Sequence, residues 1–149
     1  MITTKPDLLI KEIYDSFSFL PGSMPHYDQL KNLFYPGGIL MPPRHQKSDD
    51  HTVLSVDNFV QMSQEFIENS EFAKLGFHES EIARKEEQFG DTMVVLSAYE
   101  GRFKAEDEEA ISRGINNIQL IHEQDRWWVV SMIWDEETEE NPLPDWVGE

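Results

Sequence analysis

The chain has 149 residues, of which 12 are Lys or Arg and 29 are Asp or Glu, so its formal net charge is −17. This excess of negative charge repels phosphate groups, which argues against nucleic acids and anionic membrane surfaces as partners. The sequence contains no cysteine, so disulfides, thiolate nucleophiles and zinc–sulfur sites are excluded. With 39% hydrophobic and 11% aromatic residues, the length predicts one domain with a single core.

The two ends of the sequence differ in character. The first 17 residues, MITTKPDLLIKEIYDSF, lack a basic leader region, and no apolar run in the chain approaches the ~20 residues of a membrane span. We therefore expect no signal peptide, no membrane span and a cytoplasmic location. Residues 135–149 carry seven acidic and no basic side chains. This predicts a domain over residues 1–137 and a solvated acidic tail over 138–149, in which Trp146 is the side chain expected to dock.

Three helices are predicted in the first half of the chain. The first lies within residues 4–20, because Pro6 and Asp7 suit a first helical turn and Pro21-Gly22 follows as a stop signal. Its apolar stripe consists of Leu9, Ile13, Phe17 and Leu20. The second lies within residues 23–38 and ends at Pro-Gly; its inward side chains are Tyr27, Leu30, Leu33 and Phe34. The third lies within residues 55–72, with Ser55 as its N-cap; its inward side chains are Phe59, Ser63, Phe66 and Ile67.

The remainder of the chain has the pattern of β-strands. A short strand is expected near residues 38–43, followed by a polar loop over residues 42–54. Four strand-length segments then cover residues 76–90, 91–104, 112–124 and 125–137, separated by turn-like stretches. The first of these is unusually charged, which is typical of an edge strand or of a strand with one solvated face. Three helices followed by an antiparallel meander predict an α+β fold.

Three stretches carry a resemblance to a known superfamily: the first-helix pattern that ends in Pro21-Gly22, LKNLFYPGG (30–38) and RGINNIQLIHEQDRWWVVSMIWDEE (113–137). They resemble the NTF2-like superfamily, also called SnoaL-like or cystatin-like α+β cone proteins. The resemblance implies three N-terminal helices packed on a strongly curved, mostly antiparallel sheet, with a cone-shaped cavity between them. It implies no single function, because the superfamily contains both enzymes and non-catalytic binding proteins.

The tryptophan-rich last segment offers a test of this cavity. In a regular strand, Trp128, Val130, Met132 and Trp134 share one face, while Trp127, Val129, Ser131 and Ile133 share the other. Both faces are apolar, so both are expected to be covered. One face would line the cavity, and the other would pack against a second subunit in a homodimer.

Five residues are the candidate ligand-binding set. We expect Tyr14, Tyr99 and Asn116 to orient a small apolar or aromatic ligand, with Trp128 and Trp134 packing on it. The ordinary alternative for Tyr14 is a core tyrosine with a satisfied hydroxyl. The ordinary alternative for Asn116 is a cross-strand scaffold contact.

Catalysis is left as an alternative. The resemblance to ketosteroid isomerase would place Tyr14 on the first helix as an oxyanion donor, but the first strand has no carboxylate base, and Gly114 and Asn116 stand where a second acid would be sought. A lyase or isomerase would therefore need another base, for which Glu79, His78 and Glu100 are the strand candidates. A third possibility is an assembly module whose cavity is filled by its own side chains.

No cofactor and no metal site are expected. The histidines form no closely spaced pair such as the one that a scytalone dehydratase would need, and Asp49-Asp50-His51 lies in a polar loop. Arg84 and Arg113 are expected to be ion-pair partners rather than anion ligands in so acidic a chain.

Overall fold

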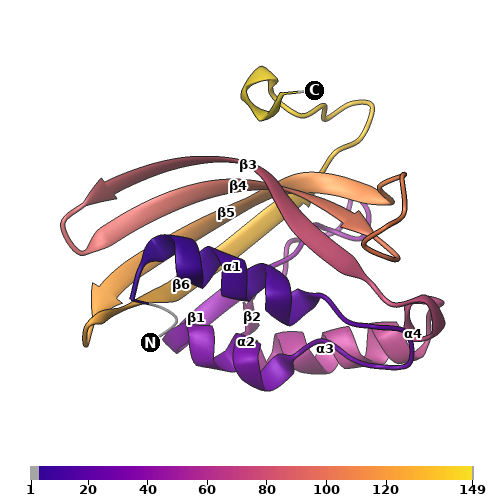
Figure 1. Ribbon diagram of the computed structural model, residues 1–149, viewed down its shortest axis with the longest axis horizontal. Helices are drawn as coiled ribbons and strands as arrows, with labels where there is room; N and C mark the ends of the chain where they lie inside the picture. Colours follow the sequence, from indigo (N-terminus) through magenta and orange to yellow (C-terminus); the bar gives the residue numbers. More distant parts are fainter. Residues whose placement is uncertain (1–3, 149) are drawn as a thin grey trace.

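One curved mixed sheet with helices on its concave side makes up the computed structural model, which describes residues 4–148 (Figure 1). The helices are α1 (Pro6–Phe17), α2 (Tyr27–Leu33), α3 (Val56–Glu68), α4 (Phe72–Leu75) and the 3-10 turn η1 (Asp145–Val147). The strands are β1 (Phe34–Met41), β2 (Leu54–Ser55), β3 (His78–Phe89), β4 (Thr92–Arg102), β5 (Ser112–Glu123) and β6 (Arg126–Glu136). The predicted α+β class is confirmed.

The strand order in the sheet is β2-β1-β6-β5-β4-β3. Strands β3 to β6 form the antiparallel meander that the sequence predicts, whereas β1 pairs with β6 in parallel. The charged segment β3 lies at one edge of the sheet, as its composition indicates. Gln124 and Asp125 between β5 and β6 have φ of 57° and 61°, the positive values that a two-residue type I′ hairpin requires.

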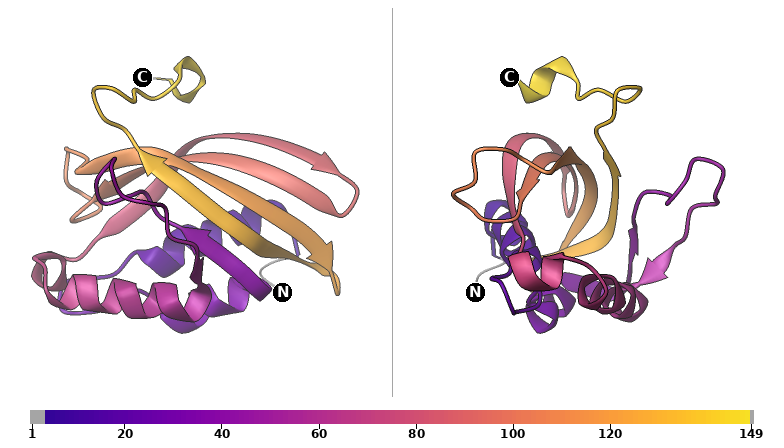
Figure 2. Two further views of the ribbon diagram at one scale, coloured as in Figure 1. Left: turned by 180° about the vertical axis from the view of Figure 1, so that it is seen from behind. Right: turned by 90° about the vertical axis from the view of Figure 1, so that its right-hand side faces the viewer.

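Two β-bulges interrupt the meander, one between Glu81 and Ala83 in β3 and one where β6 pairs with Gln119 and Leu120 of β5. Each extra residue bends its strand and increases the local twist. The sheet therefore curls around the helices instead of lying flat (Figure 2). Helix α1 lies across the concave face, with Leu9, Ile10 and Ile13 at most 1% exposed; burying such a side chain contributes about 1.5–3 kcal/mol each.

Two helix boundaries differ from the sequence prediction. Helix α1 ends at Phe17, so Leu20 is 75% exposed and does not continue the apolar stripe. In its place Phe19 is buried, and its backbone pairs with that of Phe77. Helix α2 ends at Leu33, because Phe34 already pairs with Val129 of β6 and the chain continues through Pro-Gly as strand β1. Strand pairing replaces the helical turn that the Pro-Gly signal alone suggested.

The face prediction for β6 is wrong for Trp128. Val130 is the extra residue of the bulge, since Gln119 pairs with Ser131 and Leu120 with Val129. Trp127 and Val129 before the bulge therefore share the concave face with Met132 and Trp134 after it. All four of these side chains belong to the core cluster or pack against it: Trp127, Val129, Met132 and Trp134. Trp128 lies on the opposite face.

The C-terminal segment follows β6 and lies over the convex face of the sheet (Figure 2). Trp146 in η1 stacks under the ammonium of Lys85, with 5.1 Å between Nζ and the ring centroid. The tail therefore contacts β3 through an aromatic anchor, as expected for Trp146. Helices that are both long and apolar enough to cross a bilayer are absent from residues 4–148.

Candidate functional site

A cavity of about 240 Å³ lies between helix α3, the end of α1 and the concave face of the sheet. Its walls are mainly aromatic, with seven rings from four parts of the chain: Phe17, Phe19, Phe59, Phe66, Phe72, Phe77 and Trp134. The rings support one another edge to face, for example Phe59 against Phe17 and against Trp134, each pair with centroids 5.9 Å apart. Pro25, Met62, Ile67 and Met132 add further apolar surface.

Helix α3 supplies one wall because its apolar side faces the sheet. Ser55 caps this helix as predicted, accepting a hydrogen bond from the Asn58 amide at 3.1 Å. The four side chains predicted to face inward all line the cavity: Phe59, Ser63, Phe66 and Ile67. Phe66 is nevertheless 59% exposed and Met62 is 41% exposed. These two side chains mark the place where the cavity reaches the surface.

Three polar side chains line the cavity: Ser63, Glu79 and Asn116. The Ser63 hydroxyl already has a partner, the Tyr27 hydroxyl at 2.8 Å. Glu79 is half-buried as a residue, and its carboxyl has neither a hydrogen bond nor an ion pair with any residue in the described range 4–148. Burial among apolar walls, with a smaller contribution from the charge of Glu136, raises the pKa of Glu79 to about 8. Its carboxyl is therefore mainly protonated at neutral pH.

Asn116 begins a chain of buried hydrogen bonds. Its Nδ2 donates to the Tyr14 hydroxyl at 3.1 Å, and that hydroxyl lies 2.7 Å from Ser97 Oγ. Ser97 donates its single proton to Glu81, so Tyr14 must donate to Ser97 and accept from Asn116. This direction fixes the orientation of the amide. Asn116 Oδ1 is left without a hydrogen-bond partner among residues 4–148, on a side chain only 2% exposed that lines the cavity.

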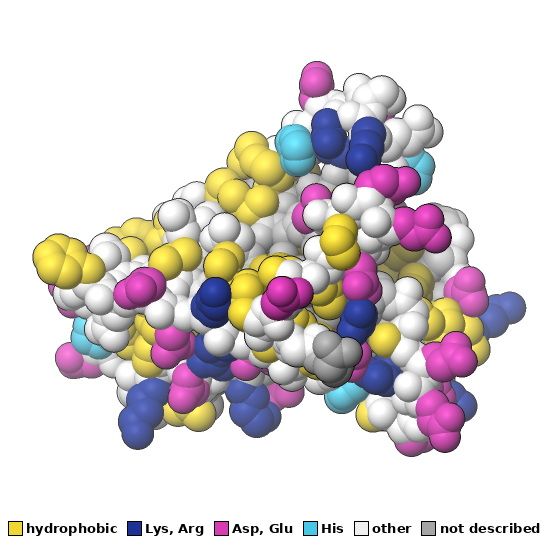
Figure 3. Space-filling model, turned by 90° about the horizontal axis from the view of Figure 1, so that it is seen from above, with side chains coloured by type: hydrophobic (Ala, Val, Ile, Leu, Met, Phe, Trp, Pro, Cys, Tyr) yellow, Lys and Arg dark blue, Asp and Glu magenta, His cyan; other side chains and the backbone are white. Residues whose placement is uncertain are grey.

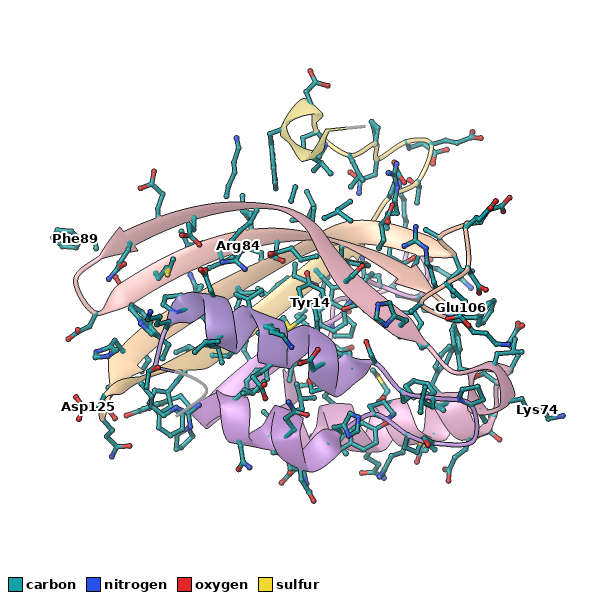
Figure 4. All side chains as sticks on the ribbon, in the orientation of Figure 1. Tyr14, Lys74, Arg84, Phe89, Glu106 and Asp125 are labelled. Atoms are coloured by element: carbon teal, nitrogen blue, oxygen red, sulfur yellow. The ribbon has the colours of Figure 1, made fainter. Side chains whose placement is uncertain are left out.

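The outer end of this chain is an ion-pair cluster. Arg84 binds Glu81 through Nε and Nη2 at 2.9–3.2 Å and also pairs with Asp7 of α1. Residues three apart in a regular strand point to opposite faces, but the bulge after Glu81 brings Glu81 and Arg84 to the same face. Figure 4 shows Arg84 between the sheet and α1, and Tyr14 directed from α1 toward the sheet. The chain of contacts fastens α1 to three strands.

Comparison with known proteins identifies the fold of this chain and does not identify a function. No protein-family model matches the sequence, and no curated protein matches it significantly. Among solved structures, a protein of unknown function with a cystatin-like fold from Nostoc punctiforme PCC 73102 has a TM-score of 0.65 at 13% identity, over 89% of this chain and 92% of that one. An NTF-2 like protein of unknown function from Silicibacter pomeroyi DSS-3 gives 0.57 at 12% identity, over 88% and 92%. LinA gives 0.60 at 6% identity, over 87% and 82%.

This chain has the NTF2-like fold. The resemblance seen in the sequence is thereby confirmed at the level of fold, with four helices and a 3-10 turn within residues 4–148 where three helices were expected. At such low identities the NTF2-like neighbours assign neither ligand nor reaction, so the candidate residues are judged by their own geometry.

Two of the five candidate ligand-binding residues of this NTF2-like chain, Asn116 and Trp134, line the cavity. Tyr14 lies behind Asn116, with its hydroxyl already paired on both sides. Tyr99 is 3% exposed and lies over Gly114, where an added Cβ would sit 2.5 Å from its hydroxyl. Burial raises the pKa of both tyrosine hydroxyls, so both stay protonated. Neither Tyr14 nor Tyr99 is part of the cavity wall.

Trp128 lies outside the NTF2-like cavity. Its ring packs edge to face on Tyr35, with centroids 5.6 Å apart, and stacks on the Arg126 guanidinium at 3.6 Å. Its Nε1 donates to the backbone carbonyl of Glu123 at 2.9 Å. These contacts tie β6 to β1 and to the β5–β6 hairpin. The bulge at Val130, which the sequence pattern does not reveal, is the reason for the difference.

Of the three strand candidates for a titratable cavity group, only Glu79 reaches the cavity. Glu100 pairs with Arg102 at 2.8 Å, and His78 faces a separate surface groove beside the loop after α1. Arg113 forms a two-bonded pair with Glu137, in agreement with the expected ion-pair role. In residues 4–148 no three His, Asp or Glu side chains cluster so that they could hold a metal ion.

Proposed function

We propose that this chain binds a small, largely apolar molecule in the aromatic cavity. The observation that supports this most is an apolar space of about 240 Å³ whose lining includes two polar groups without partners in the described chain, Asn116 Oδ1 and the Glu79 carboxyl. A few convergent polar groups in an apolar pocket are typical of ligand sites, where they orient the ligand. A cavity of about 150 Å³ holds benzene, so the present volume suits a ligand of roughly ten non-hydrogen atoms.

Calorimetric titration with 2-phenylethanol tests this proposal, because the molecule has the right size and one polar end. Ser63→Phe places a ring inside the cavity and is expected to abolish binding. Ser63→Ala is the matched control: it loses the same hydroxyl contact to Tyr27 but leaves the space open. Equal binding by the two variants would show that the ligand binds outside the cavity. A wild-type protein that binds no small aromatic molecule would refute the proposal.

We also propose that the chain forms a homodimer through the part of the convex face that the C-terminal segment leaves exposed. Apolar side chains gather on this face (Figure 3), among them Val94, which is 37% exposed, and Ile133, which is 38% exposed. Packing two such faces together would remove them from water. Native mass spectrometry of protein purified from its own host would give the subunit count and detect a co-purifying small molecule; a monomer at micromolar concentration would contradict the dimer.

A second candidate function is proton transfer in the same cavity, as a lyase or isomerase would use. Glu79 favours it, because a carboxyl with a pKa of about 8 can exchange a proton near neutral pH. In its ionised form the carboxylate would remove a proton from the carbon next to the carbonyl of a bound ketone and then return a proton to the same carbon. Hydrogen–deuterium exchange of 4-phenyl-2-butanone in D₂O, followed by NMR, should then be faster with wild-type protein than with Glu79→Gln. Equal rates would remove this candidate.

A further inference from the structure

We propose that the preferred ligand of this cavity is an apolar amine that binds as its ammonium ion. The ammonium group pairs with the Glu79 carboxylate, and the hydrophobic body of the ligand lies among the aromatic rings. The inference rests on the proposed binding function, since it names the ligand class for the same cavity.

The charges around the cavity favour a cation. Among the lining residues that the structure describes, Glu79 is the only ionisable side chain, and the lining contains no Lys, Arg or His. The charge that acts on Glu79 is that of Glu136, which disfavours a second negative charge beside it. A bound ammonium ion would neutralise the Glu79 carboxylate and reduce this repulsion. The net charge of −17 also raises the local concentration of cations and lowers that of anionic ligands.

The number of acceptors also matches an ammonium ion. Asn116 Nδ2 gives one of its two protons to Tyr14, and Asn116 Oδ1 remains an acceptor without a partner among residues 4–148, on a side chain that lines the cavity. Glu79 contributes a carboxylate, which only accepts hydrogen bonds. An alkylammonium carries three donors and can satisfy both groups, whereas a neutral alcohol has one donor and a carboxylate ligand has none. The remaining walls are aromatic faces and edges, and ring faces attract a cation within about 6 Å.

Binding of the ammonium ion is coupled to proton release. The titratable groups around Glu79 are Tyr14 on α1, Tyr99 on β4 and Glu136 on β6. Both tyrosines remain protonated, because burial raises their pKa values. The pKa of Glu79 is about 8, so at lower pH Glu79 must lose its proton before it can pair with the ammonium. Since only the ionised fraction is competent, the apparent amine affinity should rise roughly 50- to 100-fold from pH 6 to pH 8.5.

Calorimetry with two matched probes tests the inference. 2-Phenylethylamine and 2-phenylethanol have the same size and differ in their polar end, and an alkylamine stays protonated at pH 8.5. At that pH we expect wild-type protein to bind the amine at least about tenfold more tightly than the alcohol. Glu79→Gln should reduce this ratio to near one. Glu87→Gln removes the same charge from an exposed position of β3 outside the cavity, so it should leave the ratio unchanged.

The outcomes separate the two proposals. Alcohol binding with no preference for the amine, or an amine preference that survives Glu79→Gln, overturns the ammonium inference and leaves the binding function standing. Failure of wild-type protein to bind either probe overturns both. A ratio that falls equally in Glu79→Gln and Glu87→Gln would assign the preference to the overall charge and also overturn the pairing with Glu79.

Discussion

Replacing Glu79 by Gln should stabilise the protein, by an amount that grows with pH. Burial, with a smaller contribution from Glu136, raises the pKa of the carboxyl to about 8 from an ordinary value of 4.5. Below pH 4.5 the group is protonated in the folded and the unfolded chain, so it costs nothing. Between pH 4.5 and 8 the unfolded chain has released a proton that the folded chain keeps, so the free energy of unfolding falls as the pH rises. Above pH 8 the loss is complete.

The size of the effect follows from the pKa and from the shape of the cavity. One pH unit corresponds to about 1.36 kcal/mol, so the interval from 4.5 to about 8 sets an upper bound of about 5 kcal/mol. The cavity reaches the surface at Met62 and Phe66, so water can approach the carboxylate and lower this cost. We expect about half of the bound, or ~2–3 kcal/mol, at pH 9. That is a large share of the ~5–15 kcal/mol typical of a domain.

Urea unfolding followed by tryptophan fluorescence at pH 5, 7 and 9 measures this effect. The difference in unfolding free energy between Glu79→Gln and wild type should be below about 1 kcal/mol at pH 5 and reach ~2–3 kcal/mol at pH 9. Glu87→Gln, which alters an exposed carboxylate of the same strand, should give a difference that does not change with pH. Carboxylates that do not interact with Glu79 contribute equally to all three proteins and cancel in the difference. If the profiles of Glu79→Gln and wild type run parallel, the carboxyl is solvated and the reasoning is refuted.

Three further predictions concern the scaffold and the walls of the cavity. Tyr14→Phe should cost ~1–3 kcal/mol in urea unfolding, because it leaves the buried amide donor of Asn116 unpaired. Gly114→Ala should cost ~1–3 kcal/mol or more, since the new Cβ would lie 2.3 Å from a backbone carbonyl of β6; stability within 0.5 kcal/mol of wild type would contradict this packing. Trp134→Phe should weaken 2-phenylethanol binding about threefold, while Trp128→Phe should leave it unchanged, and the opposite order would reverse the assignment of these faces.

Much of the fold could be predicted from periodicity and turn residues. The four long strands agree with the predicted segments to within a few residues, because Gly90-Asp91 and Gln124-Asp125 interrupt otherwise continuous strand patterns. Helix α3 was recognisable from its Ser55 cap and its apolar stripe. These signals are local, so they survive without knowledge of the tertiary partners.

The differences occur where pairing between distant segments decides the outcome. Nothing in the residues near Val130 marks a bulge, yet that one extra residue moves Trp128 to the face opposite Trp134. The bulge after Glu81 likewise brings Arg84 into the hydrogen-bond chain, whereas the acidic composition predicted only that Arg84 forms an ion pair. The helix boundary at Phe34 also depends on a strand 95 residues away, since Phe34 pairs with Val129.

The candidate site was predictable in part. Asn116, one of the five candidate ligand-binding residues, lines the cavity, and so does Glu79, one of the three strand residues named as a possible base. The choice of Glu79 over Glu100 depends on the arginines that neutralise Glu100, Arg102 and Arg113, whose positions come from cross-strand register. Phe72 and Phe77 line the cavity because the short helix α4 begins at Phe72 and ends just before Phe77. A helix of four residues has too short a pattern to be predicted from sequence.

The central claim is that the aromatic cavity is an accessible binding site, and methyl NMR of methionine tests it most directly. Met132 and Met62 line the cavity, whereas Met41 and Met93 do not. Titration of protein labelled with ¹³C at the methionine methyl groups should shift the Met132 and Met62 signals saturably with 2-phenylethanol or 2-phenylethylamine, and leave those of Met41 and Met93 in place. Signals of Met132 that stay fixed, or that move no more than those of Met41 and Met93, would contradict the account.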